Sequence, residues 1–284
     1  MTFQKKISSL LLIGAASMSQ AQLFGVSSTG STNDFCQINT STGAATSLFS
    51  FGIPGLTNVL ALTYIPTTDK FITTGQIDAF HSVLIEIDAN AQTATVVSHG
   101  IPSNYFEGIE YSAAEGGLAV SYGPGGFYSG NLALLNDTTY SLIANNASTT
   151  LPDGDTLFVD ATGSLNVMDT NNPGLNGFMR NRFTNPFGAS TIAGVGANMY
   201  NAVDADFAYK TDEGRLFVTE QTTLGFVNDP TSTVITTVGG YGANSNGTAF
   251  RMLGLAAKPV PEPATLAGIG LGILGSLRRR KRGA

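Results

Sequence analysis

The residue types that most often carry out catalysis are scarce in this chain. It has two histidines, His81 and His99, and one cysteine, Cys36. Neither histidine lies in a His-Glu-x-x-His arrangement or near the cysteine, so a zinc site or a Ser-His-Asp triad has little to build on. Cys36 has no second cysteine to pair with, and we expect it to be a small buried residue.

Carboxylates are more plentiful, and some of them are grouped. Oxygen ligands suit Ca²⁺, which takes about six to eight of them. The spacing is not that of an EF-hand loop, and aspartates at the turns between strands are the ordinary explanation. The grouped residues are Asp153, Asp155 and Asp160, and Asp204, Asp206, Asp212 and Glu213. Calcium is the one cofactor that these residues would suit, and we predict neither a cofactor nor a metal site.

Two pairs of glutamates have the residue types of a glycosidase acid and base. The pairs are Glu107 with Glu110, and Glu86 with Glu220. Whether such a pair acts depends on the separation of its carboxyl groups, which a sequence does not give. We therefore predict no catalytic residue, and an enzymatic function stays the less favoured alternative.

The elements that position these residues are predicted to be β-strands, because two hairpins recur along the chain. In the first, a turn precedes Phe71, Leu118, Leu165 and Leu216, which are separated by 47, 47 and 51 residues. An apolar partner strand lies ahead of each turn, so each pair of strands is predicted to form a β-hairpin. These partner strands are predicted at 60–64, 108–111, 157–159 and 205–209.

A second hairpin follows each first one. Its apolar anchors Ile38, Ile87, Leu135 and Val227 are 49, 48 and 92 residues apart, and a degraded copy at 179–183 fills the last gap. Asn or Asp follows each anchor, as a turn requires. Four strands in every 47 to 50 residues is the period of a propeller blade.

The repeat count predicts an all-β fold, a five-bladed β-propeller closed by its termini. Residues 253–256 resemble the first strand of a blade and 23–27 resemble a second strand. One blade built from both chain ends would close the ring and remove the exposed edges of an open sheet. The WD signature and tryptophan are absent, and a β-sandwich or β-solenoid is the alternative architecture.

Both chain ends have the composition of targeting segments. Lys5 and Lys6 precede an apolar run at 7–16, and small residues lead up to Ala21. This order is typical of a secretory signal peptide at 1–21, with cleavage after Ala21.

The C-terminal end has three parts in a fixed order. Pro261, Glu262 and Pro263 precede an apolar stretch at 264–277, whose 14 residues would form a helix of about 21 Å, short of a hydrocarbon core about 30 Å thick. Five basic residues follow and would stay on the cytoplasmic side. They are Arg278, Arg279, Arg280, Lys281 and Arg282.

This tail resembles the PEP-CTERM sorting signal of exported Gram-negative bacterial proteins. The resemblance implies recognition of Pro261, Glu262 and Pro263 by a membrane-embedded exosortase, with 264–277 as a transient inner-membrane anchor and 278–282 as the stop. It also implies a bacterium that makes exopolysaccharide or biofilm. The resemblance covers about the last 25 residues. We therefore expect a signal peptide at 1–21, a propeller-like body of repeats of about 48 residues at 22–259, and the sorting signal at 260–284.

The net charge of the body limits the classes of molecule that it can bind. Residues 22–260 hold 7 Lys and Arg against 19 Asp and Glu, a formal charge of −12, which argues against nucleic acid. The expected partners are the secretion machinery, exosortase and exopolysaccharide, and the expected location is the cell surface or the extracellular space. Two functions stay open: a non-enzymatic surface or matrix protein, which we favour, and an extracellular polysaccharide hydrolase or lyase.

Overall fold

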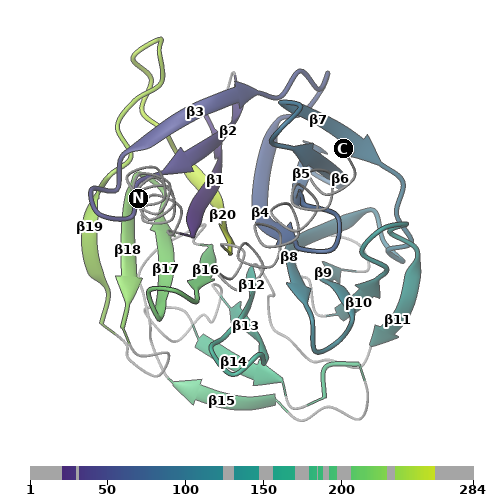
Figure 1. Ribbon diagram of the computed structural model, residues 1–284. Coiled ribbons are helices and arrows are strands. Elements are labelled where there is room, and N and C mark those ends of the chain that lie inside the picture. Colours follow the sequence, from purple (N-terminus) through teal and green to yellow (C-terminus); the bar gives the residue numbers. More distant parts are fainter. Residues whose placement is uncertain are drawn as a thin grey trace, which may run out of the picture. The chain divides into compact units, whose positions relative to one another are not determined.

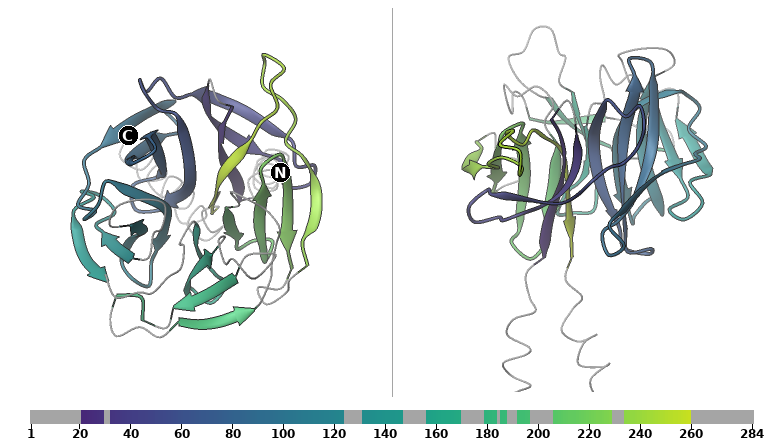
Figure 2. Two further views of the ribbon diagram at one scale, coloured as in Figure 1. Left: turned by 180° about the vertical axis from the view of Figure 1, so that it is seen from behind. Right: turned by 90° about the horizontal axis from the view of Figure 1, so that it is seen from above.

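The body of the chain is a ring of five four-stranded antiparallel sheets, as the computed structural model in Figure 1 shows. The structure describes residues 21–29, 32–123, 131–146, 156–169, 179–183, 185–187, 192–196, 206–228 and 234–259. Figure 2 shows the same ring from behind and from above. Residues Gln22–Lys258 form one compact unit.

Each sheet is one blade, and its strands follow one another from the innermost at the axis to the outermost at the rim. Blade 1 contains β20 (Met252–Lys258), β1 (Gln22–Ser28), β2 (Asn33–Ile38) and β3 (Ala45–Ser50). Blade 2 contains β4 (Asn58–Ile65), β5 (Lys70–Asp78), β6 (His81–Asp88) and β7 (Thr93–Val97). Blade 3 contains β8 (Tyr105–Ser112), β9 (Gly117–Gly123), β10 (Asn131–Leu135) and β11 (Leu142–Asn146). Blade 4 contains β12 (Thr156–Val159), β13 (Leu165–Asp169), β14 (Met179–Phe183) and β15 (Ile192–Gly196). Blade 5 contains β16 (Phe207–Lys210), β17 (Arg215–Glu220), β18 (Thr223–Val227) and β19 (Thr236–Gly240).

This arrangement confirms the predicted five-bladed propeller closed by its termini. β20, from the C-terminal end, pairs antiparallel with β1, from the N-terminal end, and Gln22 lies opposite Lys258. The four predicted partner strands fall on the innermost strands β4, β8, β12 and β16. The degraded repeat at 179–183 is β14, the third strand of blade 4. The predicted C-terminal apolar helix lies outside the described residues.

Among the described residues, the buried apolar side chains form five clusters, and each cluster lies between two neighbouring blades. Between blades 1 and 2, Phe24 and Phe35 meet Phe71, with Phe35 and Phe71 ring centroids 5.0 Å apart. Between blades 5 and 1, Phe217 and Leu224 meet residues of β1, β2 and β20. The remaining three clusters join blades 2 and 3, 3 and 4, and 4 and 5. The ring therefore has one apolar contact surface per pair of blades, and closure buries the last of them.

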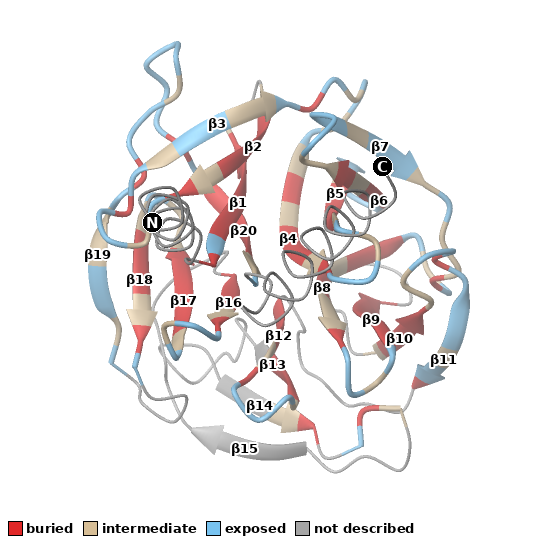
Figure 3. Ribbon diagram, viewed as in Figure 1, coloured by how far each residue is buried: buried red, intermediate tan, exposed pale blue. Residues whose placement is uncertain are grey.

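Burial falls from the axis to the rim, as Figure 3 shows for the described side chains. All seven residues of β9 are buried, whereas none of the six residues of the outermost strand β3 is buried. Inner strands are covered on both faces by the adjacent blades, and outer strands meet water on one face. This gradient explains why the apolar repeats of the inner hairpins are the clearest in the sequence.

We predict that Phe71→Ala lowers the free energy of unfolding by about 3–5 kcal/mol, because it removes a fully buried ring and leaves a cavity between blades 1 and 2. Urea unfolding followed by circular dichroism measures this change. Val96→Ala on the outer strand β7, where the residue is 45% exposed, is the control and should change stability by less than about 1 kcal/mol. Equal losses in the two variants would contradict a core located between the blades.

Candidate functional site

A buried carboxyl group lies where the innermost strands meet. Asp206 directly precedes β16 in blade 5 and is 1% exposed. The backbone N–H groups of Leu62 in β4 and Leu255 in β20 donate to its Oδ2 at 3.2 and 2.7 Å. The hydroxyl of Thr156 in β12 donates to its Oδ1 at 2.8 Å. One side chain of blade 5 thus binds the inner strands of blades 1, 2 and 4.

Glu110 in β8 adds the remaining blade to this contact. Its carboxyl group accepts hydrogen bonds from the Thr63 hydroxyl of blade 2 and the Val159 backbone N–H of blade 4. Together, Glu110 and Asp206 connect the innermost strands of all five blades. We call Glu110 and Asp206 the axial carboxyl pair.

The environment of the axial carboxyl pair favours the protonated forms. Burial raises the pKa of Asp206 to about 7, against the opposing effect of its hydrogen-bond donors. Glu110 keeps a partly exposed surface, yet the protein around its carboxyl group, and then the nearby charge of Asp206, raise its pKa well above the ordinary value. A proton held by this pair stabilises the centre of the ring.

Of the two glutamate pairs that the sequence offered, Glu86 and Glu220 lie in different blades, and Glu107 and Glu110 both lie in β8. Glu86 lies in blade 2 and accepts a hydrogen bond from the Tyr140 hydroxyl at 2.5 Å. Glu220 lies in blade 5, on the other side of blade 1, and accepts one from Thr223 at 3.2 Å. Glu107 accepts a hydrogen bond from the Tyr105 hydroxyl. The charge of Asp206 acts on Glu110, although the sequence analysis placed these two residues in different groups.

Asp160, the described member of the first group of aspartates, closes a turn. Asp160 Oδ1 accepts the backbone N–H groups of Thr162 at 2.9 Å and Ser164 at 3.2 Å. Asp153, Asp155 and Asp204 lie outside the described residues. In the described part of the chain, no three His, Cys, Asp or Glu side chains are placed to hold a metal ion.

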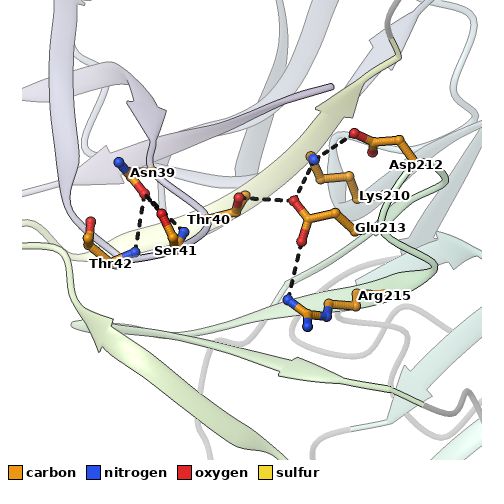
Figure 4. A network of polar contacts seen from close by, with 8 residues as sticks. All are labelled: Asn39, Thr40, Ser41, Thr42, Lys210, Asp212, Glu213 and Arg215. Atoms are coloured by element: carbon orange, nitrogen blue, oxygen red, sulfur yellow. Dashed lines mark hydrogen bonds and ion pairs between the residues drawn. The ribbon is translucent and has the colours of Figure 1, made fainter. Parts of the chain in front are cut away.

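Asp212 and Glu213 belong to an ion-pair network between blades 5 and 1, which Figure 4 shows. The Lys210 side chain is fully buried, and its Nζ lies 2.9 Å from Asp212 and 2.5 Å from Glu213. Glu213 also accepts the Thr40 hydroxyl of blade 1 at 3.0 Å and pairs with Arg215 at 3.4 Å. The network thus joins the turn after β16 in blade 5 to the turn after β2 in blade 1, at the junction where the ring closes.

A close backbone approach accompanies this network. Gly43, in the turn between β2 and β3, has φ +78°, and a Cβ there would lie 2.5 Å from the carbonyl oxygen of Gly239 in β19. Only glycine fits a position that is both left-handed and this close to another backbone. The outer hairpin of blade 1 is therefore packed directly against the outer strand of blade 5.

The histidines and the cysteine have no catalytic surroundings. His81 Nδ1 lies 2.8 Å from the carboxylate of Asp78 in an exposed turn. His99 packs edge-on against Phe106, and burial lowers its pKa. Cys36 is buried, and burial, followed by the charge of Asp34, raises the pKa of its thiol, which keeps it unreactive.

The chain ends carry the remaining predicted site residues. At the N-terminal end, Ala21 is described and buried, and 1–20 lie outside the described residues. At the C-terminal end, the whole sorting signal lies outside them: Pro261, Glu262 and Pro263, the apolar stretch at 264–277 and the basic residues at 278–282. Within the described ranges, no helix is long and apolar enough to cross a membrane. Gln22 and Lys258, opposite each other in the closing pair of strands, are the points where both ends leave the body.

Comparison with protein families assigns the C-terminal end. The model of the PEP-CTERM protein-sorting motif matches residues 259–282. The chain carries a PEP-CTERM sorting signal. This motif implies an exported protein, made as a membrane-anchored precursor and processed by an exosortase for surface localisation. No curated protein matches the sequence.

Solved structures resemble the body at low sequence identity. A chain from the crystal structure of a nidogen/laminin complex has a TM-score of 0.51 at 11% identity, with 86% of this chain and 100% of that chain covered. TolB from Acinetobacter baumannii has a TM-score of 0.49 at 10% identity, with 84% and 54% covered. An auxiliary nutrient binding protein from Bacteroides thetaiotaomicron VPI-5482 has a TM-score of 0.46 at 14% identity, with 84% and 62% covered. At such identities, the first likeness shows the fold alone.

We predict that Asp206→Asn flattens the decline of stability between pH 4 and pH 7. The pKa of Asp206 is raised from 3.8 to about 7 in the folded chain, so the folded state holds a proton that the unfolded state has lost. Its stabilising effect is complete below about pH 4 and is lost as the pH rises through about 7, by at most about 1.4 kcal/mol per pH unit. Urea midpoints measured from pH 4 to 8 test this.

Asp160→Asn is the matched control for this pH series. Although burial raises the pKa of Asp160, hydrogen bonds from Thr162 and Asn166 bring it below the ordinary value. Its stabilising effect is therefore present above about pH 4 and is lost as the pH falls further. This variant should keep the wild-type slope between pH 4 and 7. The same slope in wild type and Asp206→Asn would contradict a proton held at the axis.

Proposed function

We propose that this protein is a non-enzymatic cell-surface or extracellular-matrix protein of a biofilm, whose propeller body binds other molecules or acts as a scaffold. The observation that carries the proposal is the sorting motif at 259–282, directly after a folded exported body. Exopolysaccharide is the proposed ligand class, in line with an acidic body that has little attraction for nucleic acid.

The processing steps follow from the two chain ends. Signal peptidase would cleave after Ala21, and exosortase would recognise Pro261, Glu262 and Pro263 while 264–277 anchors the precursor in the inner membrane. The basic residues at 278–282 would remain on the cytoplasmic side. Once the tail is removed, the body would reach the surface or the medium.

The structural use of the body's carboxyl groups supports a non-enzymatic body. Asp206 accepts three hydrogen bonds from backbone and Thr156, and Asp160 closes a turn. Side chains with such roles are not available to move protons on a substrate.

An extracellular polysaccharide hydrolase or lyase is the second candidate. The axial carboxyl pair favours it, because neighbouring carboxyl groups with raised pKa values also mark acid catalysts. Activity on a panel of glycans that disappears in Glu110→Gln, with the fold retained, would support this candidate over the first.

We predict that replacing Pro261, Glu262 and Pro263 by Ala abolishes processing in a host that has an exosortase. Intact mass should show a wild-type protein without its tail, found at the surface or in the medium, and a variant of full length in the membrane fraction. Pro54→Ala, at an exposed proline of the body, is the control and should be processed like wild type. Identical masses and locations for the wild type and the triple variant would contradict sorting by this motif.

A further inference from the structure

The last strand residue before the sorting tail is held by the neighbouring blade. Lys258 ends β20 in blade 1, and its Nζ forms an ion pair with the carboxylate of Asp69, in the first turn of blade 2. The same Nζ lies 5.3 Å from the ring centroid of Tyr64. The Tyr64 hydroxyl donates to Asp69 Oδ1 at 2.7 Å. We call Tyr64, Asp69 and Lys258 the tail clasp.

The internal repeat shows that the turn itself does not require Asp69. Asp69 has φ +56°, in the left-handed region, and the corresponding turns of blades 3, 4 and 5 have glycine there. These glycines are Gly116, Gly163 and Gly214, with φ of +74°, +78° and +63°. Glycine adopts this conformation without steric cost, so the backbone of this turn does not itself require a side chain at position 69. The partners of that side chain are Lys258, Tyr64 and, at 3.5 Å, the side-chain amide of Asn90. Hydrogen bonds from Lys258 and then Tyr64 are the largest effects that lower the pKa of Asp69.

The clasp lies close to the sorting motif along the chain. Only Pro259 and Val260 separate Lys258 from Pro261, so Pro261 lies within about 11 Å of Lys258 even in a fully extended chain. Pro259 has no N–H group and cannot extend the pairing of β20. The strand therefore ends at Lys258, and the clasp fixes this end.

We infer that the tail clasp restrains removal of the sorting tail by limiting the free chain between the folded body and Pro261 to Pro259 and Val260. The inference rests on the proposed processing of the tail. A processing enzyme needs an extended segment of substrate, and a segment held in a sheet becomes available only when the sheet opens locally. Loss of the clasp frees the end of β20 and supplies additional chain on the body side of the motif.

Two clasp variants test this inference in full-length protein. Asp69→Gly gives blade 2 the turn residue of its sister blades, and Lys258→Gln keeps the stem of the side chain while removing its charge. Asp88→Asn is the matched control, because it breaks the Lys70–Asp88 ion pair of the same blade, whose side chains are 27% and 24% exposed. All variants should give circular dichroism spectra like wild type.

In an exosortase-bearing host, pulse labelling and intact mass give the rate at which the tail is lost. We expect a rise of roughly 1.5- to 5-fold in both clasp variants, the factor that corresponds to one solvent-exposed ion pair. Asp88→Asn should keep the wild-type rate. A clasp variant that is processed at the wild-type rate or more slowly would overturn the inference.

Digestion by proteinase K separates the clasp from the sorting function, because it does not depend on exosortase. We expect cleavage within 255–260 to be faster in both clasp variants than in wild type and Asp88→Asn, and raised salt to reduce the difference by screening the ion pair. If digestion differs in this way but the host leaves the wild-type tail in place, the clasp is supported and the sorting proposal fails. Equal digestion of all four proteins would overturn the clasp.

Discussion

The structure depends on the pairing of β20 with β1, which joins the two ends of the chain in one sheet. Each blade packs against two neighbours through apolar side chains, one neighbour on each face. The two contact surfaces of blade 1 are complete only when β20 is in place. β20 supplies Met252 and Leu255 to the cluster with blade 5 and Ala256 to the cluster with blade 2. Closure therefore completes two of the five contact surfaces at once, which makes the ring a cooperative unit.

Polar contacts on both sides of blade 1 join it to its two neighbours. Near the axis, Asp206 accepts the N–H of Leu255, so β20 is bound to blade 5 by a buried carboxyl group. At the turn after β16, the network of Lys210 and Glu213 reaches Thr40 of blade 1. On the other side of the blade, Lys258 is bound by Asp69 of blade 2. Strand pairing alone would leave blade 1 free to shift between its neighbours, and these contacts fix it.

The sequence predicted the elements better than the contacts between them. Apolar spacing located the inner hairpins because Phe71, Leu118 and Leu165 are buried for the same reason in each blade. The spacing cannot show which groups bind one another near the axis, because the donors to Asp206 come from β4, β12 and β20, in three other blades. The signal for Asp69 was present in the sequence, as the one residue that is not glycine among four equivalent turns, but its partner Lys258 lies at the far end of the chain.

The position of the closing strand also connects the fold to the sorting signal. Lys258 pairs opposite Gln22. The two predicted processing sites therefore lie next to the same pair of strands along the chain, one just before Gln22 and one just after Lys258. Because β20 is the last strand of the body, the ring closes only after nearly the whole chain ahead of the motif has been exported. Cleavage beyond Lys258 then removes no strand, no residue of the five core clusters and no contact of Asp206. Removal of the sorting tail thus leaves the closing pair of strands and the contacts described between the blades in place.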